Sequence, residues 1–193
     1  MQRSLVGSEM CIRDRMIYVA RHGQTQYNVD GKICGHADIE LTEVGYAQAE
    51  ELAQLVSDLE QPITKIYVSP LRRAQETARI INEKVSVPIE VEPRLIEMDF
   101  GQYDGLPIET PEFQKVRVEF SLPLPDGESI MDVAGRVYPL LAELEQSDED
   151  VLLVCHNALI RVIDNYFHGK TMIDFLKFNV DNTQLLRYER KRY

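Results

Sequence analysis

Residues 17–25 have the sequence Ile-Tyr-Val-Ala-Arg-His-Gly-Gln-Thr, in which an unbroken apolar run is followed by charged, small and polar residues. A short apolar run bounded by turn residues is typical of a buried strand. The following segment, residues 42–59, has apolar residues at helical spacing. A buried strand followed by an amphipathic helix is typical of α/β domains, and we therefore predict a mostly parallel sheet covered by helices.

The rest of the chain continues this alternation. Further strands are expected at residues 66–68, 87–91 and 151–155, with strand-like stretches between 178 and 188 at the edge of the sheet. Helices are expected at 69–81, with Ser69 as N-cap and Pro70 as its first residue, at 129–145 with Ser129 as N-cap, and at 157–167. The Pro- and Gly-rich segment 101–127 is expected to contain one short helix. The resulting fold class is a three-layer α/β/α sandwich with a mostly parallel central sheet.

The composition predicts one domain and excludes several partners. A chain of 193 residues with 44% apolar residues can form one domain with a full core. A net charge of −11 without any basic tract argues against nucleic acid, because phosphate backbones need clustered positive charge. No apolar run approaches the roughly 20 residues that span a bilayer, so no membrane segment is predicted. Cys11, Cys34 and Cys155 have neither disulfide nor zinc spacing, which favours a cytoplasmic location.

Residues 1–15 differ from the rest of the chain. They show neither helical nor strand periodicity and precede a second methionine, Met16, at which the strand pattern begins. Their apolar content is too short and interrupted for a signal peptide. We therefore expect residues 1–15 to be a disordered or non-native leader and residues 16–193 to form a single domain.

Two of the four histidines stand where predicted strands end. His22 follows the first strand after Arg21, and His156 follows the strand at 151–155, just before a helix. Ligands of open α/β sheets bind beyond the carboxyl ends of the strands, and a helix N-terminus favours an anion. Either histidine alone is equally compatible with a capping or core role. Two histidines at equivalent places favour a common anion site. Gly23, next to His22, would allow the backbone to come close to a bound anion.

Arg73 falls on the apolar face when residues 69–81 are wound at about 100° per residue. Its neighbour Arg72 falls on the polar face with Glu76 and Arg79, where we expect solvent around it. A buried guanidinium group is costly without an anionic partner, and its planar fork suits phosphate. The pattern therefore predicts Arg73 at an anion site.

Five short motifs occur in order along the chain. They are Arg21-His22-Gly23-Gln24-Thr25 followed by Asn28 and Gly35, Ser69 to Ala78 with Arg73, Leu95 to Gly101 with Glu97, Pro125 to Ser129 followed by Arg136, and Val154-Cys155-His156-Asn157. Together they resemble the motifs of the histidine phosphatase (phosphoglycerate mutase-like) superfamily. The resemblance extends from Met16 to about Tyr188 and implies the phosphoglycerate mutase-like fold.

The resemblance implies a role for each residue. His22 would attack phosphorus and form a phosphohistidine, while Glu97 would protonate the leaving alkoxide and then activate water. The phosphoryl group would be bound by Arg21, Arg73, His156 and backbone N–H groups near Asn157. The residues placed around the bound substrate are Asn28, Cys34, Gly35 and Asn157. Many members of the superfamily have glycine at the position of Asn157, so the pocket is expected to differ there.

Three functions are compatible with the resemblance. We predict a metal-independent phosphomonoester hydrolase that acts through a phosphohistidine on a small phosphorylated metabolite. A cofactor-dependent phosphoglycerate mutase is the first alternative, but mutases are typically longer after the acid motif, where this chain has only residues 98–128 between Glu97 and Ser129. A non-catalytic phosphate-binding regulatory domain would not need all five chemical residues. Sugar phosphates, phosphoglycerates, ribazole phosphates and phosphoproteins remain open as substrates.

No metal or cofactor is expected. The acidic run Asp148-Glu149-Asp150 lacks an accompanying histidine or paired aspartate, so we interpret it as a solvated turn. His36 and His168 do not follow strand ends, and we expect surface or supporting roles for them, His36 bordering the substrate mouth.

Overall fold

The computed structural model describes residues 15–190 and is built around a five-stranded sheet of order β3-β2-β4-β1-β5. The strands are β1 (Met16–Arg21), β2 (Lys65–Val68), β3 (Ile89–Val91), β4 (Val151–Cys155) and β5 (Leu185–Glu189). Strands β1 to β4 are parallel, and β5 pairs antiparallel with β1 at the sheet edge. Arg21 pairs with Cys155 in register, so the residues that follow β1 and β4 leave the sheet side by side.

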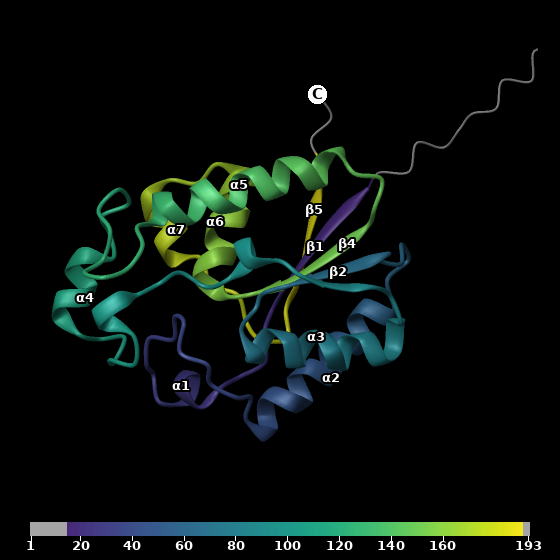
Figure 1. Cartoon of the computed structure of the whole chain (residues 1–193), viewed down its shortest axis with the longest axis horizontal. Helices are drawn as coiled ribbons and strands as arrows, with labels where there is room; N and C mark the ends of the chain where they lie inside the picture. Colours follow the sequence, from purple (N-terminus) through teal and green to yellow (C-terminus); the bar gives the residue numbers. More distant parts are fainter. Residues whose placement is uncertain (1–14, 191–193) are drawn as a thin grey trace, which may run out of the picture.

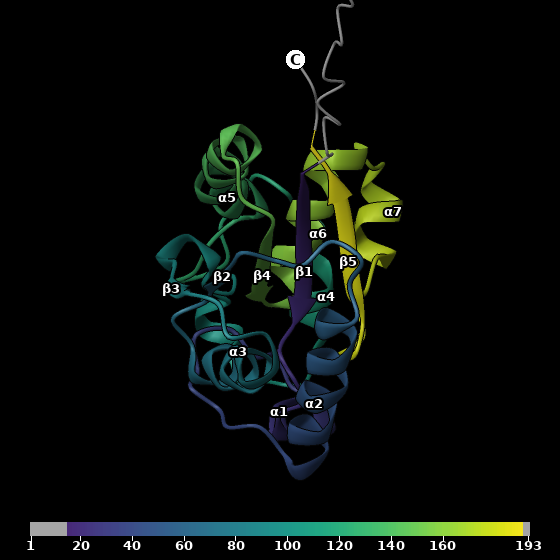
Figure 2. The ribbon, with the colours of Figure 1, turned by 90° about the vertical axis from the view of Figure 1, so that its right-hand side faces the viewer.

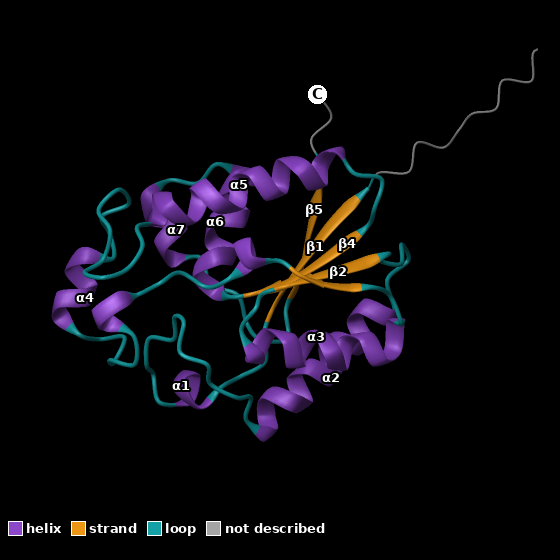
Figure 3. Cartoon of the chain, in the orientation of Figure 1, coloured by secondary structure: helices purple, strands orange, loops and turns teal. Residues whose placement is uncertain are grey.

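The helices cover both faces of this sheet. They are α1 (Gln26–Val29), α2 (Glu43–Ser57), α3 (Arg72–Val85), α4 (Pro111–Val116), α5 (Ile130–Gln146), α6 (Asn157–His168) and α7 (Met172–Lys177). Helices α2 and α3 lie on one side of the sheet and α5, α6 and α7 on the other (Figures 1 and 2). The predicted three-layer α/β/α sandwich is therefore confirmed, and Figure 3 shows the sheet between its two helical layers. None of the helices within residues 15–190 is long and apolar enough to cross a bilayer.

Side chains of β1 alternate between two apolar cores. Met16, Tyr18 and Ala20 pack with α2 and α3, whereas Ile17 and Val19 pack with α5, α6 and α7. The residues of β4 divide between the two cores in the same way. Both faces of the central strands are thus buried, which explains why they form unbroken apolar runs in the sequence.

Helix α3 begins later than the sequence predicts. It starts at Arg72 with Leu71 as N-cap, so the expected capping role of Ser69 and the helical position of Pro70 are wrong. The Ser69 hydroxyl lies 2.7 Å from Nε2 of His156 and accepts the N–H of Leu71 in a local turn. It is therefore engaged with the histidine instead of the helix.

Helices α1 and α7 are absent from the sequence prediction because they have only four and six residues, too few to show a helical period. The expected cap Ser129 and the short helix in the Pro- and Gly-rich segment are both present, the latter as α4. The chain end forms β5 at the predicted edge.

The acidic run before β4 is less exposed than predicted. Asp150 is buried, and its carboxylate accepts hydrogen bonds from the Met16 N–H at 2.8 Å and from the Gln61 amide at 2.6 Å. The interpretation as a solvated turn is therefore wrong for Asp150, since its carboxylate joins the starts of β1 and β4. Of the expected leader, residues 1–14 lie outside the described residues, and Arg15 lies 3.5 Å from Asp150.

Candidate active site

The loop after β1 fixes His22 at the carboxyl end of the sheet. The N–H of His22 donates to the carbonyl of Cys155, and the N–H of Gly23 donates to the Thr77 hydroxyl of α3, both at 3.0 Å. A Cβ atom on Gly23 would lie 2.3 Å from the carbonyl oxygen of Gly45, so only glycine allows this approach to α2. His22 is thus held by the sheet and by both helices of one layer.

The His22 imidazole has the tautomer that a nucleophile requires. Its Nδ1 lies 2.7 Å from the carbonyl oxygen of Gly23, and since a carbonyl can only accept, Nδ1 has the proton. The opposite nitrogen, Nε2, accepts a hydrogen bond from Nε of Arg73 at 3.3 Å. Burial, and then the charges of Arg73 and Arg21, lower the pKa of His22 well below its usual value. The ring is therefore neutral, with a lone pair on Nε2.

His156 lies beside His22, with 5.0 Å between the ring centroids. When the Ser69 hydroxyl donates to Nε2 of His156, the ring proton of the neutral imidazole is on Nδ1. This Nδ1 is buried and has no hydrogen-bond partner within residues 15–190. Burial lowers the pKa of His156 well below its usual value. A buried donor without a partner is costly, so this N–H suits an oxygen of an anion bound at His22.

Arg73 is buried inside the molecule, with 1% of its surface exposed, as its place on the apolar face predicts. Its two terminal nitrogens donate to the carbonyls of Gly35 and Ala37 at 2.7 and 2.8 Å. Asp104 accepts the N–H groups of the same two residues and so orients their carbonyls. These partners are neutral groups, so the positive charge of Arg73 is left for an anion at His22.

Arg21 supplies a second guanidinium group at the end of β1. One terminal nitrogen donates to the carbonyl of Val180 at 2.9 Å, while the buried Nε has no partner among the described residues. Burial lowers the pKa of Arg21, and its charge acts on both His22 and Arg73. The site therefore combines two guanidinium groups and a buried N–H around one neutral imidazole.

Glu97 lies against the N-terminus of α6. Its Oε1 accepts the N–H groups of Met98 and Leu159 at 2.9 and 3.2 Å, and its Oε2 accepts the N–H of Ala158 at 3.2 Å. Burial raises the pKa of Glu97 more than these hydrogen bonds and the charge of Arg73 lower it. The carboxyl group therefore keeps a proton to higher pH than an ordinary glutamate, which a general acid requires.

The N–H groups near Asn157 are used differently from the sequence prediction. They are expected to bind a phosphoryl group, but those of Ala158 and Leu159 bind Glu97. The positive end of the α6 dipole lies against the Glu97 carboxyl group, and these hydrogen bonds oppose the effect of burial on its pKa. The N–H groups of Ala158 and Leu159 thus contact the carboxyl group of Glu97.

The remaining predicted residues lie around this site. Cys34 and Asn157 line a common cavity. Gly35 does not line this cavity, but its carbonyl accepts a hydrogen bond from Arg73. The Asn157 amide accepts the N–H of Val180 and donates to Asn179, so the extra side chain at this position ties α6 to the chain before β5. Burial raises the pKa of Cys34 to about 11, so its thiol is protonated.

Asn28 is placed less directly. It lies in α1, and its Oδ1 accepts the backbone N–H of Thr25 at 3.0 Å. It is not among the residues that line the cavity. His36, expected at the substrate mouth, bonds through Nε2 to the carbonyl of Glu97 at 2.8 Å and so supports the acid motif.

The cavity beside Glu97 has a volume of about 310 Å³. Its end near the reaction centre is formed by Arg21, Cys34, Glu97 and Asn157. Apolar side chains form most of its wall, including Ile33, Met98, Phe100, Phe113, Leu124, Val133, Val162 and Phe175. Three further cationic side chains line it, namely Lys32, Arg117 and Arg161.

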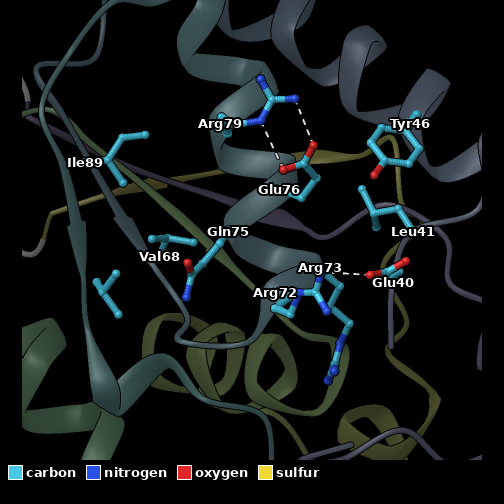
Figure 4. Close-up of a pocket in the computed structure, with 11 residues that line it drawn as sticks. Glu40, Leu41, Tyr46, Val68, Arg72, Arg73, Gln75, Glu76, Arg79 and Ile89 are labelled. Carbon is cyan, nitrogen blue, oxygen red and sulfur yellow. Dashed lines mark hydrogen bonds and ion pairs between the residues drawn. The ribbon is translucent and has the colours of Figure 1, made fainter. Parts of the chain in front are cut away.

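A second hollow of about 480 Å³ lies on the outer face of α3 (Figure 4). Three arginines line it, and two of them, Arg72 and Arg79, are paired with carboxylates. Arg72 lies 2.7 Å from Glu40, and Arg79 lies 2.8 Å from Glu76. The prediction that Arg72 points away from the buried face is confirmed.

Sequence reasoning does not single out Arg117 and Arg161. Arg161 follows Asn157 by four residues, so both lie on one face of α6, and this spacing is a usable signal. Arg117 follows the short α4 in a segment without clear periodicity. Within residues 15–190, no three His, Cys, Asp or Glu side chains are grouped so as to hold a metal ion.

The fold is that of phosphoglycerate mutase-like α/β proteins, and two arginines and two histidines lie together at the carboxyl end of its sheet. Residues 17–193 match the family model described as histidine phosphatase superfamily, branch 1. The chain therefore belongs to the histidine phosphatase superfamily, as its five motifs predict.

Curated relatives and solved structures agree with this membership. The chain is 35% identical over 168 residues to glucosyl-3-phosphoglycerate phosphatase of Mycobacterium tuberculosis, covering 79% of this chain and 74% of that protein. It is 31% identical over 176 residues to putative phosphoserine phosphatase 2 of Hydrogenobacter thermophilus, covering 87% and 86%. A solved structure of the mycobacterial glucosyl-3-phosphoglycerate phosphatase superposes with a TM-score of 0.78 at 31% identity, covering 91% of this chain and 90% of that one. Membership and these relatives identify the chain as a phosphomonoester hydrolase.

Proposed function

We propose that this protein hydrolyses a small phosphorylated metabolite through a phosphohistidine on His22. The observation that supports this most strongly is the state of the His22 ring, whose Nδ1–H donates to the Gly23 carbonyl and whose Nε2 faces Arg73. A phosphoryl group beside Nε2 would be bound by Arg73, Arg21 and the Nδ1–H of His156. These groups neutralise the charge that spreads over the phosphoryl oxygens in the transition state.

The first step forms a bond between Nε2 of His22 and phosphorus while the ester P–O bond breaks. Glu97, whose pKa is raised by burial, transfers its proton to the leaving alkoxide. In the second step the Glu97 carboxylate takes a proton from water, the water oxygen attacks phosphorus, and the P–N bond breaks. Inorganic phosphate leaves, and both His22 and Glu97 return to their starting states.

We propose that no metal or cofactor takes part. Arg21 and Arg73 supply the positive charge that a metal ion would otherwise provide. Phosphate release is therefore expected to be unchanged by EDTA. A loss of activity in EDTA that Mg²⁺ restores would contradict this mechanism, because a metal ion would then be the charge neutraliser.

The cavity supports a small substrate. Its volume of about 310 Å³ is at the lower end of the range for small-molecule sites. The two curated relatives described above are named for the phosphorylated small molecules glucosyl-3-phosphoglycerate and phosphoserine. A small metabolite is thus favoured over a phosphoprotein or nucleic acid as the partner.

The location is inferred from the cysteines. Both described cysteines are free thiols, which favours a cytoplasmic location.

The test is phosphate release from a panel of alkyl and aryl phosphomonoesters. We expect release from 4-nitrophenyl phosphate and from at least one alkyl phosphate, without the isomerisation of 3-phosphoglycerate that defines a mutase. Phosphorus NMR of the reaction separates the two activities in one sample. Isomerisation faster than release would identify a mutase, and neither reaction would identify a silent binding domain.

A further inference from the structure

We propose that Asp104 is a positioning residue for catalysis, which acts on Arg73 through the main chain of residues 35–37. This inference rests on the proposed function, in which Arg73 binds the phosphoryl group at His22. Within residues 15–190, the Asp104 carboxylate bonds to the main chain and not to either of these side chains. The proposal therefore gives a role in the reaction to a residue that the catalytic mechanism does not use.

Arg73 uses each of its guanidinium nitrogens. Its Nε donates to Nε2 of His22 at 3.3 Å, and its two terminal nitrogens donate to the carbonyls of Gly35 and Ala37 at 2.7 and 2.8 Å. The loop thus fixes the plane of the guanidinium group at two points, and the orientation of this plane decides whether Nε faces the nucleophile. Movement of the two carbonyls therefore moves the arginine relative to His22.

Asp104 holds the same two residues through their N–H groups. Its Oδ1 accepts the N–H of Gly35 at 2.9 Å, and its Oδ2 accepts the N–H of Ala37 at 3.0 Å. Gly35 and Ala37 are each fixed by Asp104 at the N–H and by Arg73 at the carbonyl. Hydrogen bonds to a carboxylate are about twice as strong as those between neutral groups, so Asp104 holds the loop firmly.

This arrangement keeps the carboxylate away from the guanidinium group itself. Among the residues that the structure describes, no carboxylate forms an ion pair with Arg73. A carboxylate in direct contact would neutralise Arg73 and compete with the phosphoryl oxygens for its donors. Because Asp104 acts through peptide groups, it can fix the arginine without this competition.

The backbone next to Asp104 is paired with the start of the same loop. The N–H of Gly105 donates to the carbonyl of Ile33 at 2.9 Å, and the N–H of Ile33 donates to the carbonyl of Leu106 at 2.8 Å. The Ile33 side chain also lines the cavity beside Glu97. Asp104 is therefore held in register with the loop, and it connects the wall of the cavity to the arginine that binds the phosphoryl group.

The same loop also reaches the acid, since Nε2 of His36 bonds to the carbonyl of Glu97 at 2.8 Å. Glu97 is held independently of the loop, because its carboxyl group accepts main-chain N–H groups and its carbonyl also accepts from Arg136 at 3.2 Å. Loss of Asp104 should therefore disturb Arg73 more than Glu97. Arg73 acts on the phosphoryl group of every substrate, whereas Glu97 matters most for an alkoxide leaving group.

A double-mutant cycle between Asp104 and Arg73 provides the test. Asp104→Asn retains one oxygen but turns an amide NH₂ group toward the second N–H, so one of the two bonds is lost. The wild type, Asp104→Asn, Arg73→Lys and the double variant are compared by kcat/KM for 4-nitrophenyl phosphate and for the alkyl phosphate that the wild type cleaves fastest. The Ki of orthovanadate and the Tm are measured on the same samples. Asp126→Asn is the matched control, since it makes the same change in an exposed carboxylate that bonds to Gln102.

We expect Asp104→Asn to lower kcat/KM by about 10- to 100-fold, as misplacement of a catalytic group does. The loss should be equal for the aryl and the alkyl substrate, and the Ki of orthovanadate should rise by a similar factor. In the Arg73→Lys background the same replacement should cost less than about twofold, because no guanidinium group remains to be positioned. Asp104→Glu should recover part of the loss, and Asp126→Asn should stay within about twofold of the wild type.

Two kinetic results would overturn the role of Asp104 in positioning Arg73, namely losses that add in the double variant and a larger loss for the alkyl than for the aryl substrate. A lower Tm with unchanged kinetics would also overturn it, because Asp104 would then serve stability alone. If Asp104→Asn does not fold, the same cycle with Asp104→Glu decides the question. An Arg73→Lys variant as active as the wild type would instead contradict the proposed function.

Discussion

The outer hollow and the inner cavity both contain arginines, but the partners of these arginines differ. In the outer hollow, Arg72 pairs with Glu40 and Arg79 pairs with Glu76 (Figure 4). In the inner cavity, Arg21 and Arg161 donate to main-chain carbonyls instead and keep their charge. The outer hollow is the larger of the two, at about 480 against 310 Å³. The two hollows thus differ in how their arginines are paired, with carboxylates in the outer hollow and with neutral carbonyl groups in the inner cavity.

The largest difference between the two regions is expected when Arg73 and its neighbour Arg72 are replaced in turn. Arg73→Ala should lower kcat/KM for 4-nitrophenyl phosphate by about 10²- to 10³-fold or more, because it removes a buried donor that acts on the transition state. Arg72→Ala should stay within about threefold of the wild type, because exposed ion pairs contribute only about 0–1 kcal/mol. Steady-state kinetics with circular dichroism as a folding control measures both. Similar losses in the two variants would show that the comparison is wrong.

Replacing Glu97 of the inner cavity and Glu76 of the outer hollow tests whether Glu97 is the general acid. Glu97→Gln cannot protonate an alkoxide, so the phosphorylation step should slow by about 10²- to 10⁴-fold with an alkyl phosphate. An aryl phosphate should lose less, since its phenolate leaves without a proton. Glu76→Gln in the outer hollow is the matched control and should leave both rates unchanged. Single-turnover quench-flow measures the step, and equal losses for alkyl and aryl substrates would remove Glu97 from the role of general acid.

The pH dependence of that step should reflect the buried groups. His22 must be unprotonated, so the rate falls as the pH drops through its pKa, which lies well below 6.5. Glu97 must be protonated, so the rate with an alkyl phosphate falls as the pH rises through its pKa, which lies above 4.5. The alkaline limb should disappear in Glu97→Gln. An alkaline limb that persists unchanged in this variant would have to come from another group.

The smallest effect is expected from removal of residues 1–15. These residues lack a structural pattern in the sequence, and Arg15 contributes a half-exposed contact with Asp150 at 3.5 Å. Exposed pairs of this kind contribute about 0–1 kcal/mol, so Tm and turnover should be nearly unchanged. Asp150→Asn is the comparison, because it weakens buried bonds at the start of β1 and should lower Tm. A drop of several degrees on truncation would show that residues 1–15 are a native part of the domain.

Features that depend on local periodicity were predictable from the sequence. The unbroken apolar run at 17–20 predicts a strand buried on both faces, and the helical position of Arg73 predicts its burial. The motifs predict which side chains meet at the sheet edge, because parallel strands end at the same edge. These features need only spacing along one element.

Features that depend on contacts between distant segments were not predictable. Ser69 looks like a helix cap in the sequence, but it bonds to His156, which is 87 residues away. The N–H groups after Asn157 look available to phosphate, but Glu97 approaches them from another loop. Arg117 has no periodic context in the sequence, yet it lines the same cavity as Arg161 of a separate helix. In each case the deciding partner is remote in the sequence.

The most direct test of the account is the position of the phosphoryl group during turnover. The Glu97→Gln variant should form the phosphoenzyme with 4-nitrophenyl phosphate but hydrolyse it slowly, because no carboxylate activates water. Intact-protein and peptide mass spectrometry after rapid quenching should then show one added phosphoryl group on His22, labile to acid and stable to alkali. The same experiment with His22→Ala should show none. A phosphoryl group on His156, on a serine or on no residue of the Glu97→Gln variant would contradict the assignment of His22 as nucleophile.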